Sequence, residues 1–279
     1  ICAQSLLTAP HFVHNGAFGE KWCAYTRRLL CQTTEKRYAP EEWPVFEGEG
    51  DLCFVANETS NGTHVPHFPD RRKGLICVDA VSSFGGVQYD VARADVWITS
   101  VQKCFGLPSG MGIMLASPKA LERAREKGDR AFYNSLLFLE DNFSKFETPY
   151  TPSILGVYLL QRLLETLPPL EVVSQHLAAR ARALYRYFEG GDLLQPLVRD
   201  TALQSPTVLA LTCPKAREVL LFLEENGAIV GKGYGHWKGS TIRIANFPAI
   251  PDADYVNLSK ILATFAADSP KNYGIPFSF

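Results

Sequence analysis

The stretch LICVDAVSSFGGVQYDVARADVWITSVQK, residues 75–103, decides the fold class. It contains two apolar runs, Leu75–Val78 and Val96–Val101, which have the length of strands and are rich in β-branched residues. Their near-continuous apolar character is typical of strands buried on both faces of a parallel sheet. An ionisable residue follows each run, Asp79 after the first and Lys103 after the second.

Further strand-sized runs lie on both sides of this stretch, at His11–His14, Leu52–Ala56 and Gly112–Ala116. Helical stretches are interleaved with them, at Phe18–Leu30 and from Ser117-Pro118 to Lys127. The second of these has Ser as N-cap, Pro at the first helical position and Gly128 as its stop. Strands interleaved with helices predict an α/β protein whose mainly parallel sheet is covered on both faces.

A second, smaller α/β region follows near Thr151. Two helices, 152–167 and 170–188, are separated by Pro168-Pro169. Strands are predicted at 207–211, 228–230 and 241–245, and helices at 215–226 and 252–265. We therefore expect a large domain, residues 1–165, and a small C-terminal domain, residues 166–279. The tail after Asp268 is predicted to be extended.

The composition excludes several classes of protein. Hydrophobic residues make up 46% of the 279 residues and charged residues 20%, which excludes a disordered or fibrous chain. The net charge of -1 gives no field that attracts nucleic acid or an anionic membrane. No apolar stretch reaches the roughly 18 residues needed to span a bilayer.

Cysteine and histidine usage argues against disulfides and metal centres. The seven cysteines are an odd number and include no CxxC pair, so we expect free thiols in a reducing compartment. No signal peptide is recognisable, and a cytoplasmic location is predicted. The pairs His11/His14 and His64/His67 have no third ligand near them in sequence, so no metal site is predicted.

Asp79 and Lys103 are the strongest candidates for chemistry. Both follow strands, and ligands of open α/β sheets bind at the carboxyl ends of the strands. Taken singly, Asp79 could cap a turn and Lys103 could be a solvated surface lysine. Lys103, however, lies among apolar and small residues, where desolvation lowers the pKa of an amine. Such an amine forms a Schiff base with an aldehyde, and a facing carboxylate keeps a pyridinium nitrogen protonated. The pair therefore points to pyridoxal 5′-phosphate (PLP).

Six short motifs accompany this pair. They are Asp79-x-Val81-Ser-Ser, Ser100-x-Gln-Lys-x-x-Gly-x-Pro-x-Gly, Gly16-x-Phe18, Asn57-Glu-Thr-x-x-Gly62, Thr148-Pro-x-Thr and Gly235-His-x6-Arg243-Ile-Ala-Asn. Together they resemble the class V aminotransferases, PLP enzymes of fold type I, and among them the phosphoserine aminotransferases. The resemblance runs from Asn15 to the end of the chain, with the motifs in the family's order.

The resemblance implies a role for each matching residue. Lys103 would hold PLP as a Schiff base and move the proton during transamination. Asp79 would pair with the pyridinium nitrogen. Phe18 would stack on one face of the cofactor ring, and Val81 would pack against the other. The remaining cofactor contacts would be Thr59 at the ring hydroxyl and Gln102 and Ser100 near the phosphate.

The three remaining implied roles concern the partner subunit and the substrate. Thr148 would reach the cofactor phosphate of a neighbouring subunit, which implies a homodimer with shared active sites. Arg243 would clamp the substrate α-carboxylate with its planar fork, and His236 would also bind substrate. The implied reaction is transamination between phosphoserine and 2-oxoglutarate in L-serine biosynthesis.

The substrate motif leaves alternatives open. Many phosphoserine aminotransferases have Gly-His-Arg where this chain has Gly235-His236-Trp237, and Lys238 is the nearest substitute cation. An alanine- or serine-glyoxylate aminotransferase is therefore the second hypothesis. The family also begins with a Gly-Pro segment and a Gly-Ser/Ala-Thr loop that cradles the PLP phosphate, and neither is found in the chain from Ile1 onward. The resemblance thus implies an incomplete N-terminus, and a truncated, non-catalytic homologue is the third hypothesis.

Overall fold

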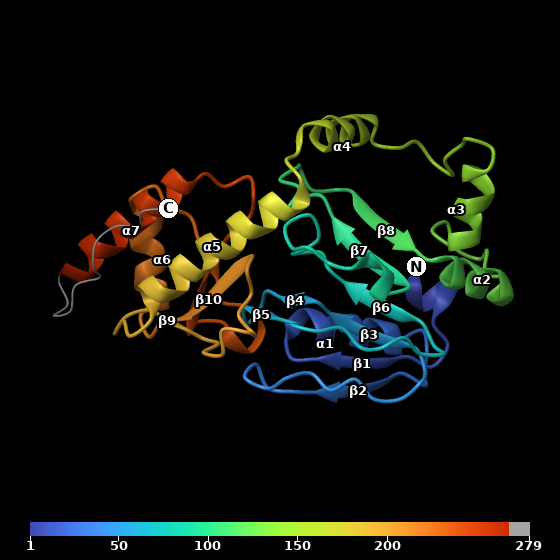
Figure 1. Cartoon of the computed structure of the whole chain (residues 1–279), viewed down its shortest axis with the longest axis horizontal. Helices are drawn as coiled ribbons and strands as arrows, with labels where there is room; N and C mark the ends of the chain where they lie inside the picture. The colour runs from blue at the N-terminus through green and yellow to red at the C-terminus, as the bar shows by residue number, and fades with distance from the viewer. Residues whose placement is uncertain (268–279) are drawn as a thin grey trace.

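The computed structural model describes residues 1–267, and the extended tail predicted after Asp268 lies outside them. Figure 1 shows two groups of strands, a large sheet built by the first half of the chain and a smaller sheet built by the C-terminal part. The prediction of an α/β protein with a mainly parallel large sheet and a small C-terminal α/β region is confirmed.

The large sheet has the strand order β2-β1-β3-β6-β7-β8. Its strands are β1 His11–His14, β2 Thr34–Arg37, β3 Leu52–Val55, β6 Ile76–Asp79, β7 Val96–Ser100 and β8 Gly112–Ala116. The first five in this order pair in parallel, and β8 pairs antiparallel to β7. Apolar clusters lie on both faces, one around Phe12 and Val96 and the other around Phe54 and Trp97. Burial on both faces explains why these strands are almost continuously apolar.

Two predicted helices lie next to the large sheet, α1 Ala17–Arg27, which ends three residues before the predicted Leu30, and α2 Pro118–Lys127, which has the predicted bounds. Three further elements were not predicted: α3 Leu136–Phe143, the π-helix Cys2–Leu6 and the 3₁₀ turn Val91–Arg93. Ser117 caps α2, because its Oγ accepts a hydrogen bond from the Ala120 N–H at 3.2 Å. Gly128 ends the helix in the left-handed conformation, with φ of 65°.

The small sheet is antiparallel, in the order β11-β12-β10-β9. The C-terminal part of the chain that contains this sheet consists of α5 Leu170–Phe188, β9 Gln195–Pro196, β10 Val208–Thr212, α6 Ala216–Glu225, β11 Gly231–Lys232, the 3₁₀ turn η3 Gly235–Trp237, β12 Thr241–Ala245 and α7 Asp252–Ala267. The strand predicted at 228–230 is wrong, since pairing with β12 begins only at Gly231. An apolar cluster that includes Leu184, Leu209 and Ile242 forms the core of this part.

Two further elements matter for the site. A hairpin of β4 Asn57–Glu58 and β5 Thr63–His64 follows the large-sheet strand β3. Helix α4, Ile154–Thr166, lies between α3 and α5 (Figure 1), and none of its residues is buried. The domain boundary expected after residue 165 falls in the last turn of α4, just before Pro168 and Pro169, and it stays a prediction.

Two smaller expectations concern thiols and membrane spans. All seven cysteines are free, as expected, and all but Cys31 are buried. Among residues 1–267, no helix combines the length and apolar character needed to cross a membrane.

Candidate active site

Asp79 and Lys103 lie at the carboxyl ends of two neighbouring strands. Asp79 is the last residue of β6 and pairs in register with Ile98 of β7. Lys103 lies in the turn that follows β7, which is closed by hydrogen bonds from the Gly106 N–H to the Lys103 carbonyl and from the Leu107 N–H to the Val101 carbonyl, both 3.0 Å. The predicted placement of the carboxylate and the amine at one sheet edge is therefore found in the structure.

The environment of Asp79 favours its protonated form. Burial raises the pKa of this carboxyl to about 6, and the charge of Glu58 adds to the effect. Two neighbours oppose it. The Val81 N–H donates a hydrogen bond to Asp79 Oδ1 at 2.9 Å, and the positive charge of Lys103 also favours the ionised form. A cation placed against Asp79 would stabilise the ionised carboxylate and offset the cost of burying it.

The environment of Lys103 favours a neutral amine. Burial lowers its pKa, and the neighbouring charge of Arg243 lowers it further. Lys103 Nζ lies 5.7 Å from the centre of the Phe247 ring. Among residues 1–267, the structure gives this amine no hydrogen bond and no ion pair. Lys103 thus has the properties of a lysine that can react as a nucleophile.

Phe18 is held at the N-terminus of α1 by the β4–β5 hairpin. The buried carboxylate of Glu58 accepts hydrogen bonds from the N–H groups of Phe18 and Gly19 at 3.0 and 3.1 Å, and Ser60 Oγ accepts from the Ala17 N–H at 2.9 Å. A negative group at a helix N-terminus satisfies its free N–H groups and its dipole. Gly16 permits this approach, because a Cβ there would lie 2.3 Å from Glu58 Cγ.

Asn57 connects the two sheets through a buried hydrogen-bond network. Its Nδ2 donates to Ser82 Oγ at 2.8 Å and to Thr207 Oγ1 at 3.0 Å, and Ser205 Oγ donates to its Oδ1 at 2.7 Å. Ser82 follows β6, whereas Thr207 and Ser205 precede β10. The loop after Asp79 is therefore anchored to the small sheet.

Arg243 reaches toward the hairpin from β12. Its Nε donates to the Lys232 carbonyl at 2.8 Å and its Nη1 to the Thr59 carbonyl at 3.1 Å. In the described part of the chain, no carboxylate forms an ion pair with it. Burial lowers the pKa of the guanidinium, and the charge of Glu58 partly offsets the effect. A half-buried guanidinium without a carboxylate partner is well suited to bind an anionic ligand.

The other predicted site residues differ in how far they are buried. Thr59 is buried, and its carbonyl accepts the hydrogen bond from Arg243. Phe18 stacks on Tyr234 with ring centres 5.0 Å apart. Gln102 and Thr148 are exposed. The His236 side chain is 81% exposed, and its Nε2 lies 3.7 Å from Glu20 Oε2. Hence Phe18, Thr59, Asp79, Val81, Lys103 and Arg243 form a connected group, while Gln102, Thr148 and His236 lie on the surface.

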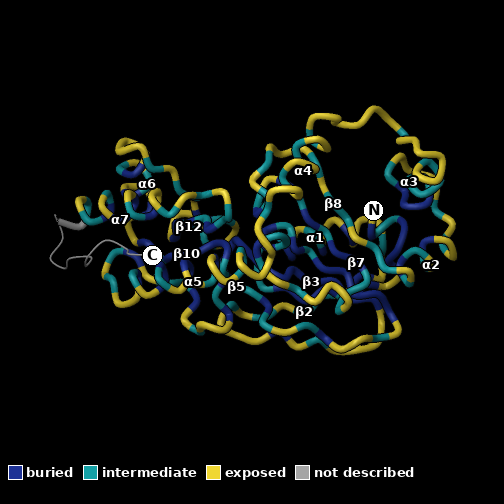
Figure 2. Tube along the Cα trace, turned by 45° about the horizontal axis from the view of Figure 1, so that its top comes forward, coloured by how far each residue is buried: buried dark blue, intermediate teal, exposed yellow. Residues whose placement is uncertain are grey.

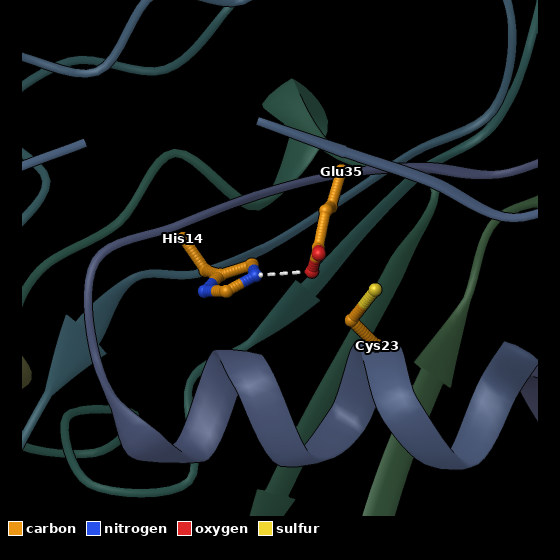
Figure 3. Close-up of side chains that lie close together, drawn as sticks. All are labelled: His14, Cys23 and Glu35. Atoms are coloured by element: carbon orange, nitrogen blue, oxygen red, sulfur yellow. Dashed lines mark hydrogen bonds and ion pairs between the residues drawn. The ribbon is translucent and has the colours of Figure 1, made fainter. Parts of the chain in front are cut away.

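A second cluster, shown in Figure 3, was not anticipated from the sequence. His14, Cys23 and Glu35 bring their potential metal-ligating atoms within 4.8 Å of one another, and His14 Nε2 lies 3.1 Å from Glu35 Oε2. Arg27 and Arg37 also contact the Glu35 carboxylate, at 3.6 and 3.5 Å. Because two guanidinium groups already neutralise this carboxylate, we interpret the cluster as an ion-pair network that joins β1, β2 and α1.

A cavity of about 840 Å³ lies elsewhere, between α5 and the segment around residues 195–206. None of the nine predicted site residues lines it. Its volume is ample for a metabolite, but the reactive groups are at the edge of the large sheet. We therefore place the candidate active site at Lys103.

A family comparison agrees with this placement. The model of the family described as Aminotransferase class-V matches residues 52–241, a range that contains Asp79 and Lys103. The chain belongs to the class-V aminotransferase family. This confirms the resemblance inferred from the motifs and makes the protein a PLP-dependent transaminase.

Several curated relatives and solved structures are similar to this class-V aminotransferase. A phosphoserine aminotransferase of Rhodococcus opacus is 31% identical over 265 residues, which cover 88% of this chain and 70% of the relative. One from Corynebacterium glutamicum is 30% identical over 248 residues, covering 84% and 65% of the two chains. The crystal structure of a phosphoserine aminotransferase from Cytophaga hutchinsonii has a TM-score of 0.84 and 25% identity, covering 96% of this chain and 79% of that one.

Relatives named for other reactions share the fold. A pyridoxamine-pyruvate aminotransferase from Mesorhizobium loti has a TM-score of 0.83 at 21% identity, covering 97% of this chain and 77% of that one. An alanine-glyoxylate aminotransferase from Nostoc has a TM-score of 0.80 at 21% identity, covering 94% and 76%. At these identities the similarity establishes the class-V fold and leaves the substrate open.

The residues of this class-V chain fit the family's cofactor. Asp79 offers a carboxylate with a raised pKa, suited to a pyridinium, and Lys103 offers an amine with a lowered pKa, suited to an aldehyde. Ser100 Oγ, at the end of β7, is buried without a hydrogen-bond partner in the described residues. A polar group of a cofactor bound beside Lys103 would give this hydroxyl the hydrogen-bond partner that it lacks.

Several residues around the site carry no recognisable signal in the sequence. Glu58 belongs to a quoted motif, but its capping of α1 depends on a contact across some 40 positions. The buried Arg180 fixes the 246–252 segment through Asn246, Phe247 and Asp252. In the structure Arg180 lies on the buried face of α5 together with Leu177 and Leu184, where an arginine is rare.

Proposed function

We propose that this protein transfers the amino group between phosphoserine and 2-oxoglutarate, using PLP held at Lys103 and Asp79. The observation that carries the proposal is the placement of a desolvated amine and a desolvated carboxylate at the ends of β6 and β7. The curated phosphoserine aminotransferases at about 30% identity support this choice of substrate.

In the proposed mechanism PLP, when bound, supplies an electron sink for the substrate Cα–H bond. Lys103 Nζ accepts the proton from the substrate Cα and returns it to the cofactor side as general base and acid. The carboxylate of Asp79 holds the proton on the pyridine nitrogen. Phe18 and Val81 would cover the two faces of the cofactor ring. Thr59 would contact the ring hydroxyl, and Ser100 and Gln102 would lie near the cofactor phosphate.

For the substrate, we propose that Arg243 binds the α-carboxylate that all amino and 2-oxo acid substrates share. The guanidinium is already oriented by the Lys232 and Thr59 carbonyls, so less rotational freedom is lost on binding. His236 and Lys238, both exposed on the η3 turn and its end, would meet the distal phosphate. Trp237 stands where many relatives carry an arginine, so recognition of the phosphate depends on these two residues.

The acceptor assay tests the choice of substrate. With glutamate as donor, we expect kcat/KM for 3-phosphohydroxypyruvate to exceed that for glyoxylate by about tenfold or more, because its phosphate gains charge-assisted contacts with His236 and Lys238 that glyoxylate cannot make. Equal or greater turnover with glyoxylate would refute the phosphoserine assignment and favour the alanine/serine-glyoxylate alternative. No turnover with any acceptor would favour the non-catalytic homologue.

We also propose a homodimer with shared active sites. The proposal rests on exposed apolar side chains of α4, of the end of α3 and of the segment between them: Ile154 is 73% exposed, Leu155 67%, Phe143 78% and Phe146 97%. Figure 2 shows α4 and this segment as largely exposed. An apolar surface of this kind marks an interaction site in a stable protein. Thr148 belongs to the same segment, so a second copy docked here would bring Thr148 toward the partner's site.

A charge on α4 is expected to separate the subunits. Leu155→Glu puts a carboxylate into the proposed interface but removes no buried contact, so the chain should fold and sediment as a monomer where the wild type is a dimer. Ile229→Glu is the matched control, because Ile229 is 88% exposed and lies on the small α/β part. A monomeric wild-type chain, or a Leu155→Glu variant that stays dimeric, would contradict the proposed interface.

A further inference from the structure

Tyr234 lies at the junction of the two sheets, on the segment between β11 and the η3 turn. Its half-buried ring stacks on Phe18 of α1, with ring centres 5.0 Å apart and planes 5° apart. The two stacked rings therefore link the small sheet to the N-terminus of α1. A residue from the C-terminal part therefore fixes the ring that flanks the proposed cofactor site.

Two cations also contact Tyr234. Lys21 Nζ donates a hydrogen bond to the Tyr234 hydroxyl at 3.2 Å. The guanidinium carbon of Arg243 lies 5.6 Å from the centre of the Tyr234 ring, within the range of cation–π attraction. The tyrosine thus joins Phe18 and Lys21 on α1 to Arg243 on β12.

The orientation of Arg243 explains why this contact matters. Carbonyl groups hold its Nε and Nη1 atoms, and in the described residues its Nη2 atom has no hydrogen bond. The Tyr234 ring adds a contact that neither carbonyl supplies. With the ring in place, the guanidinium loses little further freedom when a carboxylate binds, and a preorganised group binds more tightly than a mobile one.

We propose that Tyr234 is a positioning residue for substrate binding: its ring, held by stacking on Phe18, orients Arg243 toward the α-carboxylate. This inference rests on the proposed role of Arg243. The affinity of the site for the α-carboxylate should then depend on the ring of Tyr234 and not on its hydroxyl, because stacking and the cation–π contact both involve the ring. Since all substrates carry the α-carboxylate, the effect is the same for every acceptor.

The experiment compares Tyr234→Leu and Tyr234→Phe in the PLP-loaded enzyme. For Tyr234→Leu we expect KM for glutamate and for each 2-oxo acid acceptor to rise about tenfold, with kcat changed less than about threefold. Tyr234→Phe keeps the ring and should restore KM to within about twofold of wild type. Tyr25→Leu is the matched control, because Tyr25 on α1 also faces a guanidinium, that of Arg28 at 4.8 Å, but lies outside the site.

Binding of maleate, an unreactive dicarboxylate, gives a readout that does not depend on turnover. Isothermal titration should show a Kd about tenfold higher for Tyr234→Leu and nearly unchanged for Tyr234→Phe. An unchanged maleate Kd in Tyr234→Leu overturns the inference, as does an equal loss in both variants, which would assign the effect to the hydroxyl. A preference for glyoxylate in the acceptor assay overturns only the phosphoserine assignment, because the inference concerns the carboxylate common to all acceptors.

Discussion

Replacing Lys103 with alanine is expected to reduce transamination by about three orders of magnitude or more, because the variant loses both the nucleophile and the proton carrier. The fold should tolerate the change. The amine of Lys103 is desolvated and makes no hydrogen bond or ion pair within residues 1–267, so its removal relieves an unfavourable burial. Steady-state turnover and thermal unfolding of the same preparation measure the two effects.

Lys103→Arg separates chemistry from charge in this experiment. Arginine keeps a cation at the end of β7 but stays protonated and does not form the imine. We expect it to be as inactive as Lys103→Ala, and a small primary amine added to Lys103→Ala to restore part of the activity. Substantial activity in Lys103→Arg would mean that the lysine acts through its charge alone, contrary to the proposed mechanism.

Asp79→Asn is expected to produce the second large loss of activity, about 100-fold to 1,000-fold in kcat. The asparagine oxygen can still accept the hydrogen bond from the Val81 N–H, so the local turn is kept. What is lost is the negative charge that would hold a proton on the pyridine nitrogen. Activity within a few-fold of wild type would remove Asp79 from the mechanism.

The same substitution should stabilise the cofactor-free protein at neutral pH. The folded-state pKa of Asp79 is raised from 3.8 to about 6, so between these values the folded state binds more protons than the unfolded state. Wild-type stability therefore falls as pH rises from about 4 to about 6, by at most about 3 kcal/mol, and stays lower above that. Asp79→Asn does not lose stability in this way, because the asparagine side chain does not ionise. Urea unfolding at pH 4 and pH 7 measures the loss, and a variant less stable than wild type at pH 7 would contradict the assigned cause.

Apolar patterning was sufficient to predict most of the strands and helices. The runs around β1, β3, β6 and β7 are apolar because both faces of the sheet are covered there, whereas β8 has an apolar run but no buried residue. Pro168-Pro169 separates α4 from α5 as predicted. The edge strand β2 was missed, since its sequence, Thr-Glu-Lys-Arg, is charged throughout. Charged edge strands avoid aggregation and carry no apolar signal.

Apolar patterning pointed to the site only where its residues are close to strand ends, and the family resemblance supplied Phe18, Thr59, Val81 and Arg243. Asp79 and Lys103 follow apolar runs, and this position identified them. Glu58 and Tyr234 act through contacts with α1 that join distant parts of the chain, which periodicity does not reveal. Thr148 and His236 are exposed, and their proposed roles depend on a partner subunit and a substrate.

Titration of the wild-type chain with PLP, followed by absorbance, tests the central claim most directly. We expect a band near the visible edge that saturates at one cofactor per chain and is absent from Lys103→Ala, because the imine requires the Lys103 amine. A wild-type chain with no such band, or a band of equal strength in Lys103→Ala, would contradict the assignment of Lys103 as the residue that binds the cofactor.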